Sequence, residues 1–137
     1  MSLDLTQLPA HILLDMYARG ETSPVEVTQA VLARTDRVNP LINAFCLVDS
    51  EAALASAAQS EARWHAHRQS GAPVGTLEGV PTTIKDLILT RGWPTLRGSR
   101  TIDPHQAWEV DAPVTARLRE AGAVLLGKTT TPEFGCK

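Results

Sequence analysis

The chain has 137 residues, a length that suits a single domain, since domains commonly run to roughly 100–200 residues. Apolar residues make up 43% of the sequence and charged residues 20%, with a formal net charge of −2. This composition supports a hydrophobic core but offers no basic surplus, so we expect neither nucleic acid nor a membrane as a direct partner.

The first elements predicted along the chain are two helices. The stretch "LPAHILLDMYARGE" places apolar residues at helical spacing, and Gly20 is well placed to end that helix. A second helix begins in "TSPVEVTQAVLARTDRVNP", where Ser23 is the expected N-cap and Glu26 the partner that closes a capping box. We expect Asn39-Pro40 to end it, because proline breaks a helix interior.

The middle of the chain predicts a strand, a helix and then irregular structure. The apolar run "NAFCLV" is typical of a strand, and the alanine-rich "DSEAALASAAQSEARWHAHRQSG" is typical of a helix with acids at its start and bases at its end. From residue 71 to residue 113 Gly and Pro recur, and only "VPTTIKDLIL" favours a strand.

The last elements are a helix and a strand. The stretch "DAPVTARLREAG" predicts a helix opened by Asp111, with Pro113 near its first position, and "AVLLGKT" predicts a strand. The whole order favours an α/β layer architecture. Three short strands make a poor sheet, because buried parallel strands need neighbours on both sides, so we expect an incomplete fold.

The stretch "GAVLLGKT" matches the written pattern of a phosphate-binding loop. Such a loop follows a strand and precedes a helix, whereas here a helix comes first and the spacer residues are strand formers. No helix follows to offer its N-terminus to a phosphate. We therefore predict a strand, with Gly122 as a helix cap and Gly127 as a turn at the strand end, and no nucleotide site.

Compartment and metal content follow from the remaining residue types. No apolar run approaches the roughly 18 residues of a membrane span, and "MSLDLTQ" lacks the features of a signal peptide, so we expect a cytoplasmic protein. Cys46 and Cys136 form no disulfide framework and no metal-ligand spacing. The histidine pair of "WHAHR" is interpreted as a solvated helix end. We expect no metal and no cofactor.

Three lysines occur, at positions 85, 128 and 137, and Lys85 is the one whose setting admits two interpretations. In the first, its aliphatic stem lies along the sheet while the ammonium group reaches water. In the second it is buried, and since desolvation disfavours the charged form, a buried lysine becomes a usable base near neutral pH. The residue pattern alone leaves both open.

The run "GTLEGVPTTIKDLILTRGWPTLRGS", followed by "DAPVTARLREAGAVLLGKTTTPEFG", resembles the amino-terminal part of the amidase signature family. The earlier "TSPVEVTQAVLARTDRVNPLINAF" is similar to the helical lead-in of that family, so the resemblance covers nearly the whole chain. It implies a mixed sheet flanked by helices. Residues 1–137 would be an amino-terminal fragment of one amidase domain, with a helical lead-in at 1–70 and the strands, loop and last helix at 71–137.

The resemblance also implies a chemistry. Members of the family hydrolyse carboxylic amides with a Ser–cis-Ser–Lys triad, and the match to "TTIKD" assigns the lysine role to Lys85. By the same match Phe134 and Cys136 would line the substrate pocket, with loop packing as the alternative. Both triad serines belong to a glycine- and serine-rich signature that this sequence does not contain. Ser99 matches an ordinary Gly-Ser and is not expected to have a base beside it, so the segment alone should be inactive.

Three functions therefore remain open. The first is an amidase acting on a small-molecule amide, with the rest of its domain supplying the serines. A close relative of that function is the amidase component of a glutamine-dependent tRNA amidotransferase, which works with partner subunits. The third, from another class, is a non-catalytic binding module. The oligomeric state, a homodimer included, is open as well.

Overall fold

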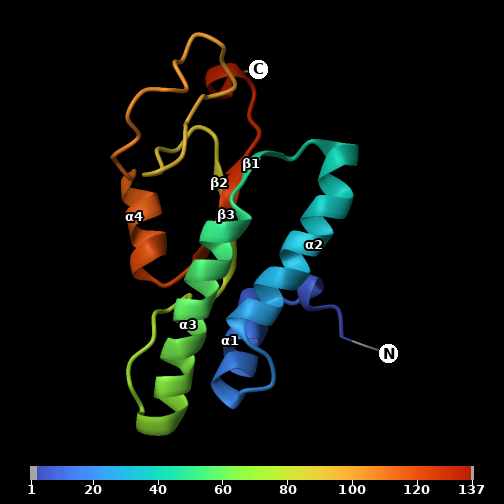
Figure 1. Cartoon of the computed structure of the whole chain (residues 1–137), viewed down its shortest axis with the longest axis vertical. Coiled ribbons are helices and arrows are strands. Elements are labelled where there is room, and N and C mark those ends of the chain that lie inside the picture. The colour runs from blue at the N-terminus through green and yellow to red at the C-terminus, as the bar shows by residue number, and fades with distance from the viewer. Residues whose placement is uncertain (1–2, 137) are drawn as a thin grey trace.

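The computed structural model describes residues 3–136 and confirms the predicted order of helices and strands (Figure 1). Two short 3-10 turns are added to that order, one near each end of the described residues. The elements are η1 (Leu5–Gln7), α1 (Ala10–Arg19), α2 (Pro24–Ile42), β1 (Phe45–Val48), α3 (Ser50–Ser70), β2 (Pro81–Lys85), α4 (Pro113–Glu120), β3 (Val124–Thr129) and η2 (Glu133–Gly135).

Local capping signals fix where the long helices begin. The Ser23 hydroxyl accepts a hydrogen bond from the Glu26 backbone N–H at 3.2 Å, and the Glu26 carboxylate accepts one from the Ser23 N–H at 2.9 Å. This is the predicted capping box, and it opens α2. Helix α3 begins in a similar way, because Asp49 accepts from the N–H of Ala52 at 3.0 Å, and it ends at Gly71 in the left-handed conformation.

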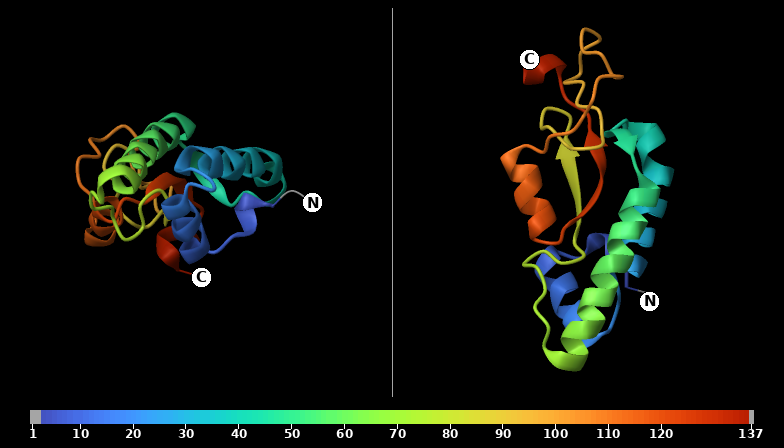
Figure 2. Two further views of the ribbon diagram at one scale, coloured as in Figure 1. Left: turned by 90° about the horizontal axis from the view of Figure 1, so that it is seen from below. Right: turned by 60° about the vertical axis from the view of Figure 1, so that its left-hand side comes forward.

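The sheet is mixed and has the order β1-β3-β2. Strand β3 runs parallel to β2 and antiparallel to β1, and within the described residues each outer strand pairs with β3 alone. Helices α2 and α3 cover one face of the sheet and α4 covers the other, as the two sides of the sheet in Figure 2 show. The predicted architecture, a mixed sheet flanked by helices, is therefore confirmed.

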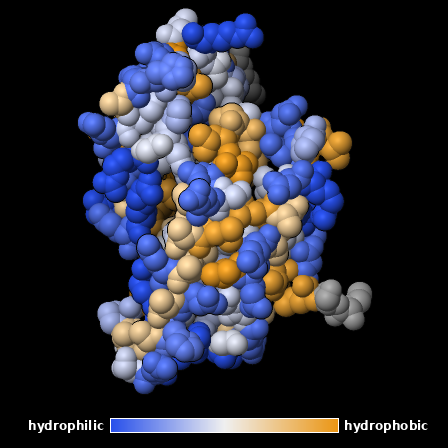
Figure 3. All heavy atoms as spheres, in the orientation of Figure 1, coloured by the Kyte–Doolittle hydropathy of each residue, from blue (hydrophilic) through white to orange (hydrophobic). Residues whose placement is uncertain are grey.

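Alternate residues of β3 supply the two hydrophobic layers. Val124 and Leu126 pack against Leu32 of α2 and the alanines Ala53 and Ala57 of α3. On the other face, Leu125 packs with Ile84 and Trp93, and Leu118 of α4 joins this cluster. Apolar side chains also reach the surface over β1 and along the seam between α2 and α3 (Figure 3).

A third cluster packs α1, α2 and α3 together at one end of the molecule, which we call the helical end. Tyr17 and Trp64 lie with their ring centroids 6.0 Å apart, and Leu13 and Val27 pack beside them. Both rings also donate hydrogen bonds to the loop before β2. The Tyr17 hydroxyl donates to the Gly79 carbonyl at 3.1 Å, and the Trp64 indole N–H donates to the adjacent carbonyl of residue 78 at 3.0 Å.

Two predicted helix boundaries were wrong. Helix α2 continues through Pro40 to Ile42 and ends where Asn43 adopts φ 49°. Pro40 lies in the last turn, and the helix continues only two residues beyond it. Helix α4 has Ala112 as its N-cap, because the Asp111 carboxylate instead accepts from the N–H of Arg91 at 2.7 Å and from the Arg119 guanidinium at 2.9 Å.

The histidine pair near the end of α3 is only partly solvated. His65 is exposed, as predicted, but His67 is half-buried. Its ring stands edge-on to Trp64, and its Nδ1 lies 2.8 Å from the carbonyl oxygen of Ala72. The chain reverses at Gly71, which brings the Ala72 carbonyl back toward the helix and gives the imidazole a partner.

Candidate active site

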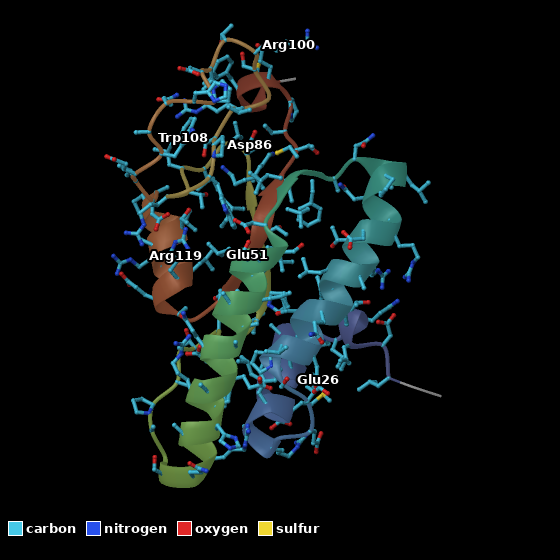
Figure 4. All side chains as sticks on the ribbon, viewed as in Figure 1. Glu26, Glu51, Asp86, Arg100, Trp108 and Arg119 are labelled. Atoms are coloured by element: carbon cyan, nitrogen blue, oxygen red, sulfur yellow. The ribbon has the colours of Figure 1, made fainter. Side chains whose placement is uncertain are left out.

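Lys85 is the last residue of β2. The next residue, Asp86, lies at the end of the sheet where the loop that follows β2 begins (Figure 4). Side chains alternate along the strand: Thr83 and Lys85 are exposed, whereas Ile84 and Asp86 are buried. Within residues 3–136 the Lys85 side chain is exposed, and its role as a base stays a prediction. The buried lysine of this region is a different one.

That buried lysine is Lys128, whose side chain has no exposed surface. Its ammonium group donates to the hydroxyl of Thr95 at 2.6 Å and to the carbonyl of Ile88 at 3.1 Å. It also lies 3.3 Å from the carbonyl oxygen of Pro94 and 3.3 Å from a carboxylate oxygen of Asp86. Burial lowers the pKa of Lys128, and the Asp86 charge opposes that shift.

A bulge in β3 determines which face Lys128 occupies. One residue separates Thr82 from Ile84 on β2, but two residues separate their partners Leu125 and Lys128 on β3. With regular pairing Lys128 would lie opposite Lys85 and share its face, because a one-residue shift turns every later side chain over. The extra residue sends the Lys128 side chain to the opposite face, where Ile84 and Asp86 are buried.

Gly127 makes this bulge sterically feasible. A Cβ at position 127 would lie 2.0 Å from the carbonyl oxygen of Leu47 in β1, so no larger residue fits without a backbone shift. The prediction that Gly127 is a turn at the strand end is wrong, since it lies inside β3. The prediction that this stretch forms a strand rather than a phosphate loop is confirmed, and Gly122 caps α4 from just beyond its end with φ 84°.

Asp86 connects the end of β2 to the loop that follows. Its N–H donates to the Thr129 carbonyl at 2.8 Å, which extends the β2 to β3 ladder by one residue. Its carbonyl accepts from the Arg97 N–H at 2.9 Å, and its carboxylate accepts from the Leu96 N–H at 3.3 Å. The residue after Lys85 is therefore attached to β3, to Lys128 and to the segment at 96–97.

Ser99 is buried and has a carboxylate beside it, which corrects the expectation that no base lies nearby. Its hydroxyl donates to Glu133 at 2.7 Å and lies 2.8 Å from the Thr101 hydroxyl. These contacts join the loop after β2 to the turn η2. A carboxylate is a weaker base than the imidazole or amine that activates a nucleophilic serine, so we interpret the contact as structural.

Phe134 and Cys136 lie on the C-terminal turn, at the same end of the sheet as the end of β2 (Figure 1). Both are exposed, and Phe134 adopts φ 50°, a conformation that L residues rarely take. The Phe134 N–H donates to the Arg97 carbonyl at 2.7 Å, which holds the turn against the loop. The structure thus places Lys85, Phe134 and Cys136 at one end of the sheet and leaves their roles as predictions.

Sequence reasoning missed Lys128, Asp86, Thr95 and Glu133. Asp86 could have been found, because it follows Ile84 by two residues and so belongs to the buried face of the strand. Lys128 could not be predicted from the alternation of buried and exposed side chains along a strand. The bulge interrupts that alternation, and five consecutive residues of β3 are buried. Gly127 was the one available signal, because glycine inside a strand often marks a bulge.

Two further kinds of feature are absent from residues 3–136. No group of three or more His, Cys, Asp and Glu side chains in this part of the chain is arranged to hold a metal ion. No helix among these residues has the length and apolar character needed to cross a membrane.

Comparison with known proteins identifies the family. The family model described as Amidase matches residues 26–137. The chain is 45% identical over 133 residues to a glutamyl-tRNA(Gln) amidotransferase subunit of Salinispora arenicola, and 42% identical over 132 residues to the corresponding subunit of Myxococcus xanthus. These alignments cover 96% of this chain but 26% of each relative, so the chain spans about a quarter of their length.

Solved structures agree. A bacterial aryl acylamidase of the amidase signature family superposes with a TM-score of 0.83 at 28% identity, over 95% of this chain and 26% of that one. The peptide amidase of Stenotrophomonas maltophilia superposes with a TM-score of 0.77 at 30% identity, over 97% of this chain and 26% of that one. The chain therefore belongs to the amidase signature family.

Proposed function

We propose that this chain is the amino-terminal part of an amidase that hydrolyses carboxylic amides, and that Lys85 is the base of its catalytic triad. The proposal rests on family membership and on the match of "TTIKD" to the family's lysine motif. The serines of such a triad lie in a glycine- and serine-rich signature outside this sequence. The catalytic unit is accordingly the longer protein, and residues 1–137 alone should be inactive.

The proposed role of Lys85 is proton transfer. Its neutral amine takes a proton from a bridging serine hydroxyl, which in turn takes the proton of the nucleophilic serine. The nucleophile then attacks the amide carbonyl, the amine leaves with a proton, and water hydrolyses the resulting ester. In this scheme Lys85 forms no covalent bond to the substrate.

One observation supports Lys85 over Lys128 for this role, namely the difference in access between the two side chains. A general base must come within hydrogen-bond reach of the proton that it abstracts. Lys85 is exposed, so a serine supplied from elsewhere in the protein can approach its amine. Lys128 is fully enclosed, and its ammonium group is already surrounded by four acceptors from the protein.

We propose further that Phe134 and Cys136 line the substrate pocket. Both side chains are exposed at the end of the sheet where β2 ends, and Ser99 and Arg97 anchor the turn that carries them. An exposed aromatic ring on a held turn supplies apolar contact area for a substrate at little entropic cost.

The test is amide hydrolysis by the full-length protein, with Lys85→Met as the variant. Arg37→Met is the matched control, because Arg37 is also a long exposed cation but lies on α2, away from the end of β2. We expect Lys85→Met to lower kcat by about 100- to 10,000-fold, the usual contribution of a positioned base, and Arg37→Met to change it less than about twofold. Full activity in Lys85→Met would refute the assignment.

A second candidate is the amidase component of a glutamine-dependent tRNA amidotransferase. It is favoured by the curated relatives, which are named as glutamyl-tRNA(Gln) amidotransferase subunits and are 38–45% identical to this chain. The two candidates differ in substrate and in the need for partners. We expect a simple amidase to hydrolyse small amides alone, whereas an amidotransferase component should hydrolyse glutamine and respond to added partner subunits. Steady-state ammonia release with each substrate distinguishes them.

A further inference from the structure

We propose that Lys128 is a positioning residue for Lys85: it fixes the loop that follows Lys85 and thereby holds the end of β2 in the geometry that catalysis needs. This inference rests on the proposed function of Lys85. The observation that carries it is the set of acceptors around the Lys128 ammonium group, all of which come from one loop, residues 86–95.

Those acceptors lie at the start and at the end of that loop. Asp86 and Ile88 come directly after β2, whereas Pro94 and Thr95 come where the loop returns to the sheet. A single ammonium group therefore draws both ends of the loop from Asp86 to Thr95 onto β3. Thr95 is itself buried, and its hydroxyl also donates to the Ile88 carbonyl at 3.3 Å, so the two ends of the loop contact each other as well.

The loop in turn fixes the backbone of Lys85. The Lys85 carbonyl accepts from the Ile88 N–H at 3.0 Å, and the next N–H, that of Asp86, donates to Thr129, the neighbour of Lys128. The bulge sends the Lys128 side chain to the face opposite Lys85. Lys128 thus acts on Lys85 through the backbone and the Asp86 carboxylate rather than at its amine.

Stability alone does not account for a lysine at this position. A buried ion pair such as Lys128–Asp86 must be removed from water, and replacing both partners of such a pair with apolar residues is often neutral or stabilising. An apolar side chain of similar length would fill the same space, but it could not hold two carbonyls, a hydroxyl and a carboxylate in fixed directions. The specific contribution of the ammonium group is therefore orientation.

Thr95→Val is the sharpest probe, because valine has the shape of threonine and lacks the hydroxyl at 2.6 Å from the Lys128 ammonium group. Thr28→Val is the matched control. Thr28 is also fully buried, lies on α2, and its hydroxyl has no hydrogen-bond partner within residues 3–136. Thr95→Ser restores the hydroxyl, and Lys128→Met removes the cation itself.

Each variant is made in the full-length protein and assayed well below its melting temperature. We expect Thr95→Val to lower kcat about 10-fold and Lys128→Met about 100-fold, with KM within about twofold, because small misplacements of a catalytic group cost this much. Thr95→Ser should recover most of the loss, and Thr28→Val should leave kcat unchanged. Hydrogen–deuterium exchange of the peptide that spans residues 86–97 should rise in Thr95→Val and Lys128→Met.

The outcomes separate the two proposals. If exchange rises and the melting temperature falls while kcat stays at the wild-type value, Lys128 is only a stabilising residue and the inference is overturned. If Lys85→Met keeps full activity, the function proposed for Lys85 fails, and the positioning role fails with it. A loss of kcat in Thr95→Val that Thr95→Ser recovers supports the positioning role, and a loss in Lys85→Met beside it supports both proposals.

Discussion

The two ends of this molecule are held together in different ways. At the helical end, α1, α2 and α3 bury Tyr17 and Trp64 against apolar neighbours. These helices begin or end at capping residues that are close to them in the sequence. At the opposite end, the loop after β2 and the C-terminal turn are joined by polar side chains, with Lys128 and Ser99 each contacting residues more than 30 positions away.

The difference separates two roles, stabilising the fold and positioning side chains. Apolar burial is non-directional, so the packing of the helical end stabilises the fold without by itself fixing the direction of a side chain. Hydrogen bonds to buried polar groups are directional and costly to leave unmade, so the network at the other end fixes positions. Substitutions at the first end should therefore change stability, and substitutions at the second should change activity as well.

The largest effect on stability is expected from Trp64→Ala at the helical end. The change removes a buried ring that contacts Tyr17 and the hydrogen bond from the indole N–H to residue 78. We expect a loss of about 3–5 kcal/mol in the free energy of unfolding, measured by urea denaturation of the protein. His65→Ala, at the exposed neighbour, should cost less than about 0.5 kcal/mol. A cost below about 1 kcal/mol for Trp64→Ala would remove the central difference between the two ends.

A smaller effect is expected from Glu78→Gln, in the loop between the two ends. Glu78 is buried and accepts from Ser60 at 2.6 Å, from the Arg63 guanidinium at 2.9 Å and from the Gly75 N–H at 2.9 Å. Glutamine keeps the shape but loses the charge-assisted contacts. We expect a loss of about 1–3 kcal/mol at pH 7, again by urea denaturation.

The same variant has a pH signature. Burial alone would raise the pKa of Glu78, but the hydrogen bonds from Arg63, Ser60 and the Gly75 N–H outweigh it and hold the pKa below the ordinary 4.5. The unfolded chain therefore takes up the proton first as the pH falls. The stabilisation is complete above pH 4.5 and is lost as the pH falls through the folded pKa. The gap between wild type and Glu78→Gln should narrow below pH 4.5, and a constant gap would contradict this account.

The smallest effect on stability, with a specific effect on activity, is expected from Ser99→Ala at the polar end. The change removes the hydroxyl that joins Glu133 and Thr101 and so loosens the turn that carries Phe134. We expect KM to rise about 3- to 10-fold, equivalent to one hydrogen bond, with kcat within about twofold. Glu133→Gln can still accept from Ser99 and should change KM less. An unchanged KM in Ser99→Ala would contradict the proposal that this turn lines the substrate pocket.

The helical end could be predicted from the sequence almost residue by residue. Its signals are local: Ser23 and Glu26 are three positions apart, and Gly20 and Gly71 stop helices where the apolar spacing ends. The wrong N-cap of α4 has a cause elsewhere in the chain. Asp111 does not cap α4, because its carboxylate accepts hydrogen bonds from the Arg91 N–H and the Arg119 guanidinium.

The polar end could be predicted only in outline. Lys85 was singled out through its motif, and its role stays a prediction. The bulge that buries Lys128 depends on how β3 pairs with two other strands, and Gly127 is its one local signal. Ser99 and Glu133 are 34 positions apart, and nothing near either residue indicates the other. Long-range polar pairs of this kind need the fold before they can be seen.

The most direct measurement compares Lys85→Met with Lys128→Met in the full-length protein, recording kcat and melting temperature together. If Lys85 is the exposed base and Lys128 the buried residue that positions it, Lys85→Met should lose activity by at least about 100-fold with little change in melting temperature. Lys128→Met should lose both activity and stability. Retained activity in Lys85→Met, or an activity loss in Lys85→Met that only follows unfolding, would contradict the account.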